Sequence, residues 1–449
     1  MRNFESLRRD WLNAVFYSRE PVLTSSAGWL DELLDIVERH AGDWMPIRAL
    51  GGERGVRYSR TAVKKQFLQR DPSSREWLLT LFKEEGRPEL NLGFIFDGDV
   101  TGEFRFRFHM MVSPLGVFRE EPQARERGQR LASFILEMAR RFPPYYACAH
   151  PFVDSTFGTE ERGKPLSMRI NEVYWLNVFG NELVDTMGRE RVLSTPAVQL
   201  EELPDGGVFL LIRPTPADYD SDAARVAQAK ALVHLHPEHS FDTVLTQLRE
   251  QSAALVPVKR EWDPDLTLVM EETFRRVLPK DDQLVIARYN AYRPPPVSEW
   301  MPLDQAPECD VEELEAADEV IGAHAEGVVA AWFHEIPGVG SYKPDTLPLI
   351  DKELWVMVKS YVFEDVSHKA RWLPALGAYL GNVLTHLGGR WVVRKAVEES
   401  YVVVGERAWL PFLRAQHCIG GTEQSVMDYS LTKFYRAAEQ HLREFQAKG

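Results

Sequence analysis

The stretch from Glu172 to Pro214 reads EVYWLNVFGNELVDTMGRERVLSTPAVQLEELPDGGVFLLIRP, and its pattern decides the fold class. A short apolar run gives way to helical spacing and then to two further apolar runs separated by Pro-Asp-Gly-Gly. Pro196 ends the helix because proline cannot continue the hydrogen-bond ladder. The predicted elements are a strand over 173–179, a helix over 181–192 with Asn181 as its N-cap, and a hairpin over 197–203 and 208–213.

The upstream part of the chain is also rich in predicted strands that are followed by a helix. Phe104, Phe106 and Phe108 alternate with charged or polar residues, as in a strand with one buried face. Predicted there are strands over 77–82, 90–96 and 103–112, a turn at Asp97-Gly98, and a helix over 123–141. The pattern indicates an α+β fold of antiparallel sheets with flanking helices. Because both halves contain a hairpin and a helix, we also advance the hypothesis of a duplicated unit.

The chain changes character after Arg293. The run RPPPVSEWMPLDQAPE is rich in proline, which favours extended backbone and predicts a linker over 294–309. It separates an α+β domain over 1–293 from a mainly helical C-terminal domain over 310–449. Further predictions are helices over 220–235, 241–250, 310–334, 352–363, 373–387 and 426–445, a strand over 284–292, a hairpin over 390–394 and 401–404, and close approach of a neighbour at Ala375, Gly377, Ala378 and Gly381.

Composition narrows the function classes. The net charge is −14, which argues against nucleic acid and anionic membrane surfaces as partners, because both need clustered Lys and Arg. Three widely spaced cysteines form no CxxC pair, so reduced thiols in the cytoplasm are expected. The N-terminus resembles no signal peptide, and no apolar run reaches the length of a membrane span.

Motifs for chemistry fail on inspection, so we expect no catalytic, cofactor or metal site. His234, His236 and His239 follow a predicted helix end and are interrupted by Pro237, which a zinc site would not favour. The remaining motifs each lack an essential residue or the flanking structure: the zincin-like His334-Glu335, the calcium-loop-like Asp97, Asp99, Thr101 and Gly102, the P-loop-like Gly158, Gly163 and Lys164, and the pair Cys148 and His150.

One long stretch of the sequence lacks lysine and arginine. From Pro294 to Tyr342 there is no Lys or Arg, whereas acidic residues are frequent. Such a surface attracts a basic protein partner. The residues expected to contact that partner are Glu308, Asp310, Glu312, Glu313, Glu315, Asp318 and Glu319. An alternative is that the acids at 310–313 only offset the dipole at a helix N-terminus, with no partner involved.

The segment over about 22–237 resembles the type VI immunity family, bacterial proteins that neutralise nuclease toxins with the VRR-NUC fold. The resemblance is carried by Trp175-Leu176-Asn177 with Gly180, by Gly188, by Pro196-Ala197 and the hairpin after it, and upstream by LGFIFDGDVTGEFRFRF. It implies a protein that acts by binding a toxin, without catalytic residues. The phrase LGAYLGNVLTHLGGRWVV resembles an uncharacterised bacterial domain, which implies nothing about function.

Three functions are compatible with these observations. The leading one is a cytoplasmic immunity protein that binds a cognate toxin, expected to be a basic nuclease, and blocks its active site. The second is a non-catalytic structural or assembly module that uses an immunity-like fold, since one fold serves many functions. The third is an enzyme of an unrecognised class, which would need a pocket with convergent polar groups. The sequence does not define the toxin or the oligomeric state.

Overall fold

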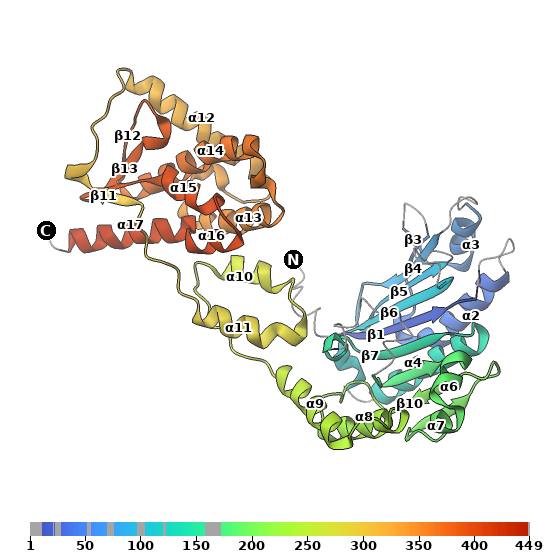
Figure 1. Ribbon diagram of the computed structural model, residues 1–449. Coiled ribbons are helices and arrows are strands. Elements are labelled where there is room, and N and C mark those ends of the chain that lie inside the picture. Colours follow the sequence, from blue (N-terminus) through green and yellow to red (C-terminus); the bar gives the residue numbers. More distant parts are fainter. Residues whose placement is uncertain are drawn as a thin grey trace. The chain divides into compact units, whose positions relative to one another are not determined.

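The chain forms two compact units, which we call the N-terminal unit and the C-terminal unit (Figure 1). The computed structural model describes residues 11–20, 22, 28–51, 55–69, 76–96, 104–119, 123–157 and 172–447. The N-terminal unit comprises Met1–Pro257 and Leu278–Gln283, and the C-terminal unit comprises Val258–Val277 and Leu284–Gly449. The division therefore falls earlier than the expected boundary at 294–309.

One antiparallel sheet organises the N-terminal unit, in the order β3-β2-β4-β5-β6-β1-β7-β8-β10-β9. Its strands are β1 Leu12–Ser18, β2 Arg48–Leu50, β3 Val56–Arg57, β4 Trp77–Lys83, β5 Glu89–Phe96, β6 Phe106–Ser113, β7 Tyr146–Pro151, β8 Leu176–Phe179, β9 Gln199–Glu202 and β10 Val208–Leu211. The expected α+β class is confirmed. The strands of the two proposed halves belong to this single sheet. Strand β1 lies between β6 on one side and β7 on the other.

Alternation explains the position of the main core. Phe106 and Phe108 of β6 are buried and contact Phe16 of β1, as the phenylalanine pattern predicts. Helices α2 (Gly28–Ala41) and α4 (Ala124–Arg141) contribute to the same apolar cluster and lie against one face of the sheet (Figure 1). The predicted strand at 103–112 begins later, at Phe106, and Asp97-Gly98 lies outside the described residues.

The remaining helices of the N-terminal unit are α3 Arg60–Leu68, α5 Phe152–Ser155, α6 Asn181–Met187, α7 Arg189–Leu193, α8 Asp222–Leu235 and α9 Phe241–Ala254. The helix predicted over 181–192 is divided at Gly188, whose φ of 93° interrupts helical geometry. Asn181 is the first helical residue and Gly180 is the N-cap, so the predicted capping role of Asn181 is wrong. The Asn181 side chain instead accepts a hydrogen bond from Arg189.

Helices dominate the C-terminal unit, around a small sheet in the order β11-β14-β13-β12. Its strands are β11 Trp300–Pro302, β12 Arg390–Val392, β13 Tyr401–Val404 and β14 Arg407–Trp409. Its helices are α10 Thr267–Phe274, α11 Asp282–Ala291, α12 Leu314–Trp332, α13 Leu347–Lys359, α14 Val366–Leu384, α15 Pro411–Ile419, α16 Glu423–Asp428 and α17 Leu431–Gln446, except that the first two residues of α11 are counted with the N-terminal unit. Among the described helices of both units, none has the length and apolar character needed to cross a membrane.

Two predictions for this region are wrong. The expected strand over 284–292 is the helix α11, in which Ile286 and Tyr289, three residues apart, are buried while Leu284 is exposed. The expected linker contains β11, which pairs with β14 through Trp300 and Trp409. Proline is tolerated there because β11 is an edge strand.

Close packing against α14 is confirmed. A side chain at Gly377 would collide with Phe412 of α15, and one at Gly381 would collide with Trp391 of β12. The final helix predicted over 426–445 is two helices, α16 and α17. The helical conformation is interrupted before Ser430, which is the N-cap of α17. The Ser430 side chain accepts a hydrogen bond from the Lys433 backbone N–H.

Candidate functional site

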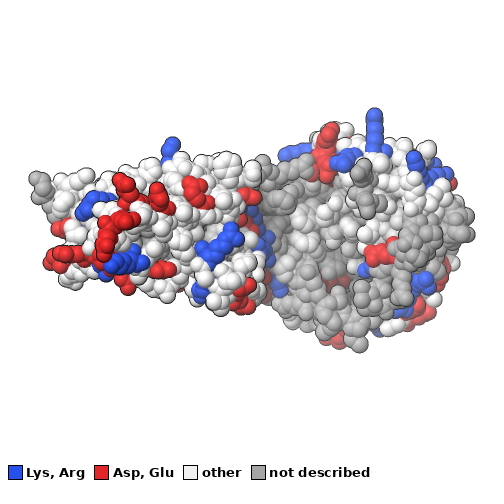
Figure 2. All heavy atoms as spheres, turned by 90° about the horizontal axis from the view of Figure 1, so that it is seen from above, with Lys and Arg blue, Asp and Glu red and all other residues white. Residues whose placement is uncertain are grey.

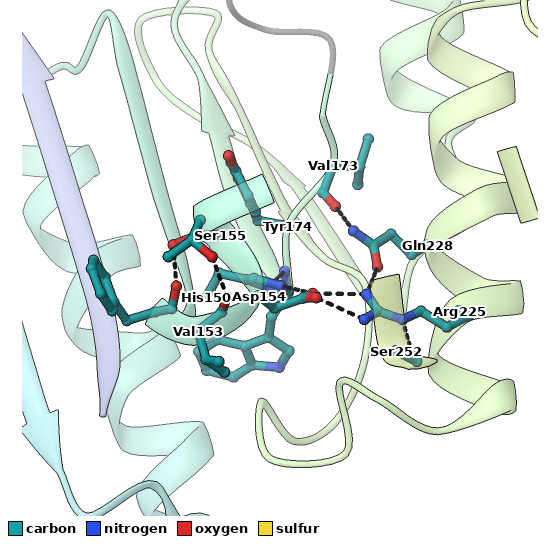
Figure 3. A network of polar contacts seen from close by, with 12 residues as sticks. His150, Val153, Asp154, Ser155, Val173, Tyr174, Arg225, Gln228 and Ser252 are labelled. Carbon is teal, nitrogen blue, oxygen red and sulfur yellow. Dashed lines mark hydrogen bonds and ion pairs between the residues drawn. The ribbon is translucent and has the colours of Figure 1, made fainter. Parts of the chain in front are cut away.

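The N-terminal unit contains a buried polar network centred on His150, Asp154 and Arg225 (Figure 3). Arg225 of α8 donates two hydrogen bonds to Asp154, from Nη1 to Oδ2 and from Nη2 to Oδ1, each 2.7 Å long. The His150 Nε2 atom lies 2.6 Å from Asp154 Oδ2. All three side chains are at most 3% exposed, so this is a buried bidentate ion pair with a histidine attached.

Hydrogen bonds define the protonation state of His150. Its Nδ1 atom accepts a hydrogen bond of 3.1 Å from the Trp175 backbone N–H, so Nε2 carries the proton and donates to Asp154. Burial lowers the pKa of His150 below its ordinary value. Burial alone would raise the pKa of Asp154, but hydrogen bonds from His150 and Arg225 hold that pKa far below the usual range. The network therefore consists of neutral histidine, carboxylate and guanidinium.

The network ties four elements together. Arg225 also donates from Nε to Ser252 of α9 and from Nη1 to Gln228, and Gln228 donates to the Val173 carbonyl. Helices α8 and α9 are thus fastened to the segment before β8 and to Asp154 of α5, which His150 links to β7. Because both ring nitrogens of His150 are engaged and the side chains of His150, Asp154 and Arg225 are buried, these three groups support the fold and offer no base or nucleophile to a substrate.

Acid should weaken the N-terminal unit through His150. The pKa of His150 is lower in the folded state than in the unfolded chain. Below about pH 6.5 the unfolded chain therefore binds a proton that the folded state does not bind, and stability decreases as the pH is lowered. We expect the free energy of unfolding to fall by up to about 1.4 kcal/mol per pH unit between pH 6.5 and 5. Half-buried His109 also has a lowered pKa and would contribute to the same pH dependence. The effect of His150 is therefore measured in the His109→Gln variant, from urea-unfolding midpoints at a series of pH values. A flat profile in that variant would contradict the assignment.

Other sequence candidates lie apart from this network. Burial raises the pKa of Cys148 to about 12, which disfavours the thiolate needed by a nucleophile. His234 contacts Ser194, whereas His236 and His239 lie near Glu238. In the part of the chain that the structure describes, no group of three or more His, Cys, Asp and Glu side chains could hold a metal ion. The calcium-loop-like residues Asp97, Asp99, Thr101 and Gly102 and the P-loop-like Gly158, Gly163 and Lys164 lie outside the described residues.

The seven predicted partner-contacting residues lie together in sequence and are all exposed. Glu308 and Asp310 precede α12, Glu313 is its N-cap, and Glu315, Asp318 and Glu319 lie in its first two turns. Figure 2 shows several acidic side chains on the face of the C-terminal unit that carries α12, with Lys and Arg side chains beside them. We call residues 304–319 the acidic segment.

Hydrogen bonds hold the first part of the acidic segment to the small sheet. The Pro307 carbonyl accepts a bond from the Tyr401 hydroxyl, and the Glu308 carbonyl accepts one from Arg394. Asp310 accepts a hydrogen bond of 2.8 Å from the Lys395 backbone N–H and pairs with Arg394 at 3.1 Å. Asp310 is therefore partly neutralised by the fold itself.

The other acids of the prediction keep their charge unpaired. Among the described residues, no ion pair involves Glu308, Glu312, Glu313, Glu315, Asp318 or Glu319. Helix-dipole compensation does not explain Asp318 and Glu319, because that effect fades within the first turn. Glu315 and Glu319 are also four residues apart, where like charges destabilise a helix.

The acidic stretch is not one continuous surface, because Glu299 is excluded. Its side chain is 1% exposed, 3.0 Å from Arg414 Nη1 and 2.9 Å from His417 Nδ1. Glu326 is also engaged, accepting a hydrogen bond from the Tyr342 hydroxyl. Glu326 and Glu335 are exposed as well, but both lie outside the acidic segment.

Comparisons with protein-family models, with curated proteins and with solved structures find no match for this chain. Sequence reasoning missed Asp154, Arg225 and Gln228. Their one visible signal was the presence of Arg225 and Gln228 on an otherwise apolar face of α8, among Ala224, Ala229 and Leu232.

Proposed function

We propose that this chain is a non-catalytic immunity protein that neutralises a basic toxin, a nuclease in the leading case, by covering its substrate groove with the acidic segment. The observation that carries the proposal is a set of exposed carboxylates that form no ion pair among the described residues: Glu308, Glu312, Glu313, Glu315, Asp318 and Glu319. A nuclease must be basic where it grips phosphate, so an acidic protein surface is complementary to that groove. The resemblance of 22–237 to the type VI immunity family supplies the toxin context.

Apolar side chains accompany the carboxylates. Leu314 and Val320 are 56% and 44% exposed, and no residue of α12 before Ile321 is buried. The first two turns of α12 therefore present both charged and apolar side chains to solvent. Interfaces use apolar side chains together with polar and charged ones, and both kinds are exposed on these two turns.

Rescue of toxicity tests the proposal directly. The gene immediately upstream is expressed in a bacterial host with and without this chain. Growth restored by a stoichiometric complex would support immunity. A neighbour that is harmless, or that kills regardless, would overturn it and bring forward the alternative of a structural or assembly module.

Charge reversal tests the surface. The triple variant Glu312→Lys, Glu315→Lys and Glu319→Lys is expected to bind the toxin about 100-fold more weakly, mostly through slower association that depends steeply on salt. Surface plasmon resonance at two salt concentrations measures both rates. The matched control reverses three exposed acids elsewhere in the same unit, Glu364, Glu398 and Glu444, with the same change in net charge. Equal losses in the two triple variants would show that only net charge matters.

A further inference from the structure

A cavity of about 640 Å³ opens at the edge of the small sheet, where the acidic segment begins. It is lined by Trp300, Pro302, Leu303, Asp304, Glu406 and Arg407. Its walls come from β11, from the start of the acidic segment and from the beginning of β14. All of these residues belong to the C-terminal unit.

Strand pairing explains the aromatic wall. Pro302 lies opposite Arg407 and Trp300 opposite Trp409, so Trp300 and Arg407 are diagonal neighbours on one face. The Arg407 guanidinium carbon lies 3.5 Å from the centre of the Trp300 ring, a close cation–π stack. One face of the indole is thus covered by a cation of the chain itself.

The charges of the cavity favour a cationic ligand. In the part of the chain that the structure describes, Asp304 and Glu406 form no ion pair, and both are exposed. They outnumber the single guanidinium of Arg407, which is engaged with the indole. An anion entering the cavity would meet two carboxylates, whereas a cation would neutralise them.

We propose that this cavity receives a lysine or arginine side chain of the protein partner. The aliphatic stem of that side chain packs against Pro302 and Leu303, and its charged head pairs with Asp304 and Glu406. A side chain held in a pocket beside a charged surface is the usual form of an interface anchor. The inference rests on the proposed function and specifies an anchor at the start of the acidic segment.

The test uses the full chain labelled with ¹⁵N-tryptophan and the peptide acetyl-Gly-Arg-Gly-amide as probe. The indole N–H signal of Trp300, identified by its loss in Trp300→Phe among the 12 tryptophans, is expected to shift saturably. The double variant Asp304→Asn, Glu406→Gln should bind the probe about tenfold more weakly, while Glu398→Gln should bind it unchanged. The proposal is overturned if the signal does not move, or if acetyl-Gly-Glu-Gly-amide moves it as far.

Binding to the toxin separates this inference from the proposed function. A peptide-dependent shift in a chain that binds no toxin would leave the cation site in place and remove the immunity role. A toxin that binds the double variant with unchanged affinity, yet fails to bind the reversed acidic segment, would remove the anchor alone. A drop of about tenfold in toxin affinity for the double variant supports both.

Discussion

Replacing Arg225 with methionine is expected to destabilise the N-terminal unit by about 3–5 kcal/mol, because it leaves the buried Asp154 carboxylate without its bidentate partner. The same change removes the contacts to Ser252 and Gln228 that hold α9 and the segment before β8. Hydrogen exchange measured on peptides from β7, β8 and α8 should show the loss in this unit.

Arg213→Met is the matched control for this prediction. Arg213 is also buried, and burial lowers its pKa, but its Nη1 and Nη2 atoms have no hydrogen-bond partner. Its Nε atom donates a hydrogen bond of 3.1 Å to the Asp218 carboxylate. Removing unsatisfied buried donors should therefore change stability by no more than about 1 kcal/mol in either direction. Similar losses for Arg225→Met and Arg213→Met would contradict the special role assigned to the Asp154–Arg225 pair.

Asp351→Ala should destabilise the C-terminal unit by about 3–4 kcal/mol. This buried carboxylate of α13 accepts bonds from the Leu431 and Thr432 backbone N–H groups, at 2.8 and 3.1 Å, where α17 begins. It also accepts bonds of 2.7 Å from the hydroxyls of Ser430 and Thr432. The substitution leaves all four donors buried without an acceptor. Urea unfolding followed by hydrogen exchange in α17 measures the effect.

Asp365→Ala provides the comparison for this second prediction. Asp365 caps α14 in the same chemical way, accepting bonds of 2.7 Å from the Ser367 backbone and hydroxyl, but it is exposed to solvent. Water can satisfy the donors that this substitution frees, so we expect a much smaller change. If the two variants unfold at the same urea concentration, burial is not what makes Asp351 important.

The spacing of apolar residues in the sequence predicted the elements that bury only one face. Alternation in β6 and helical spacing in α4 were read correctly because each element has one buried face. The central strands β1 and β7 were missed, although Leu12, Ala14 and Phe16 alternate as β6 does. Valine and isoleucine in α11 favoured a strand, and tertiary packing overrode that preference.

The exposed acids could be predicted from the sequence, whereas the buried ion pairs could not. A run without Lys or Arg identifies exposed acids from sequence alone, and the structure places all seven on the surface. Pairing across long separations leaves no such trace. Glu299 is neutralised by Arg414, 115 positions away, and Asp154 by Arg225, 71 positions away. A carboxylate whose partner is that distant cannot be distinguished from an unpaired one by inspection of its neighbours.

The bonds that fix the start of the acidic segment to the small sheet have a thermodynamic consequence. Acidic recognition segments are often disordered and must be ordered when they bind, which subtracts from affinity. Here the Pro307 carbonyl and the Asp310 carboxylate are already held, by Tyr401 and by the Lys395 backbone. A partner would therefore meet a surface that has lost its conformational entropy during folding, and more of the contact energy would remain as affinity.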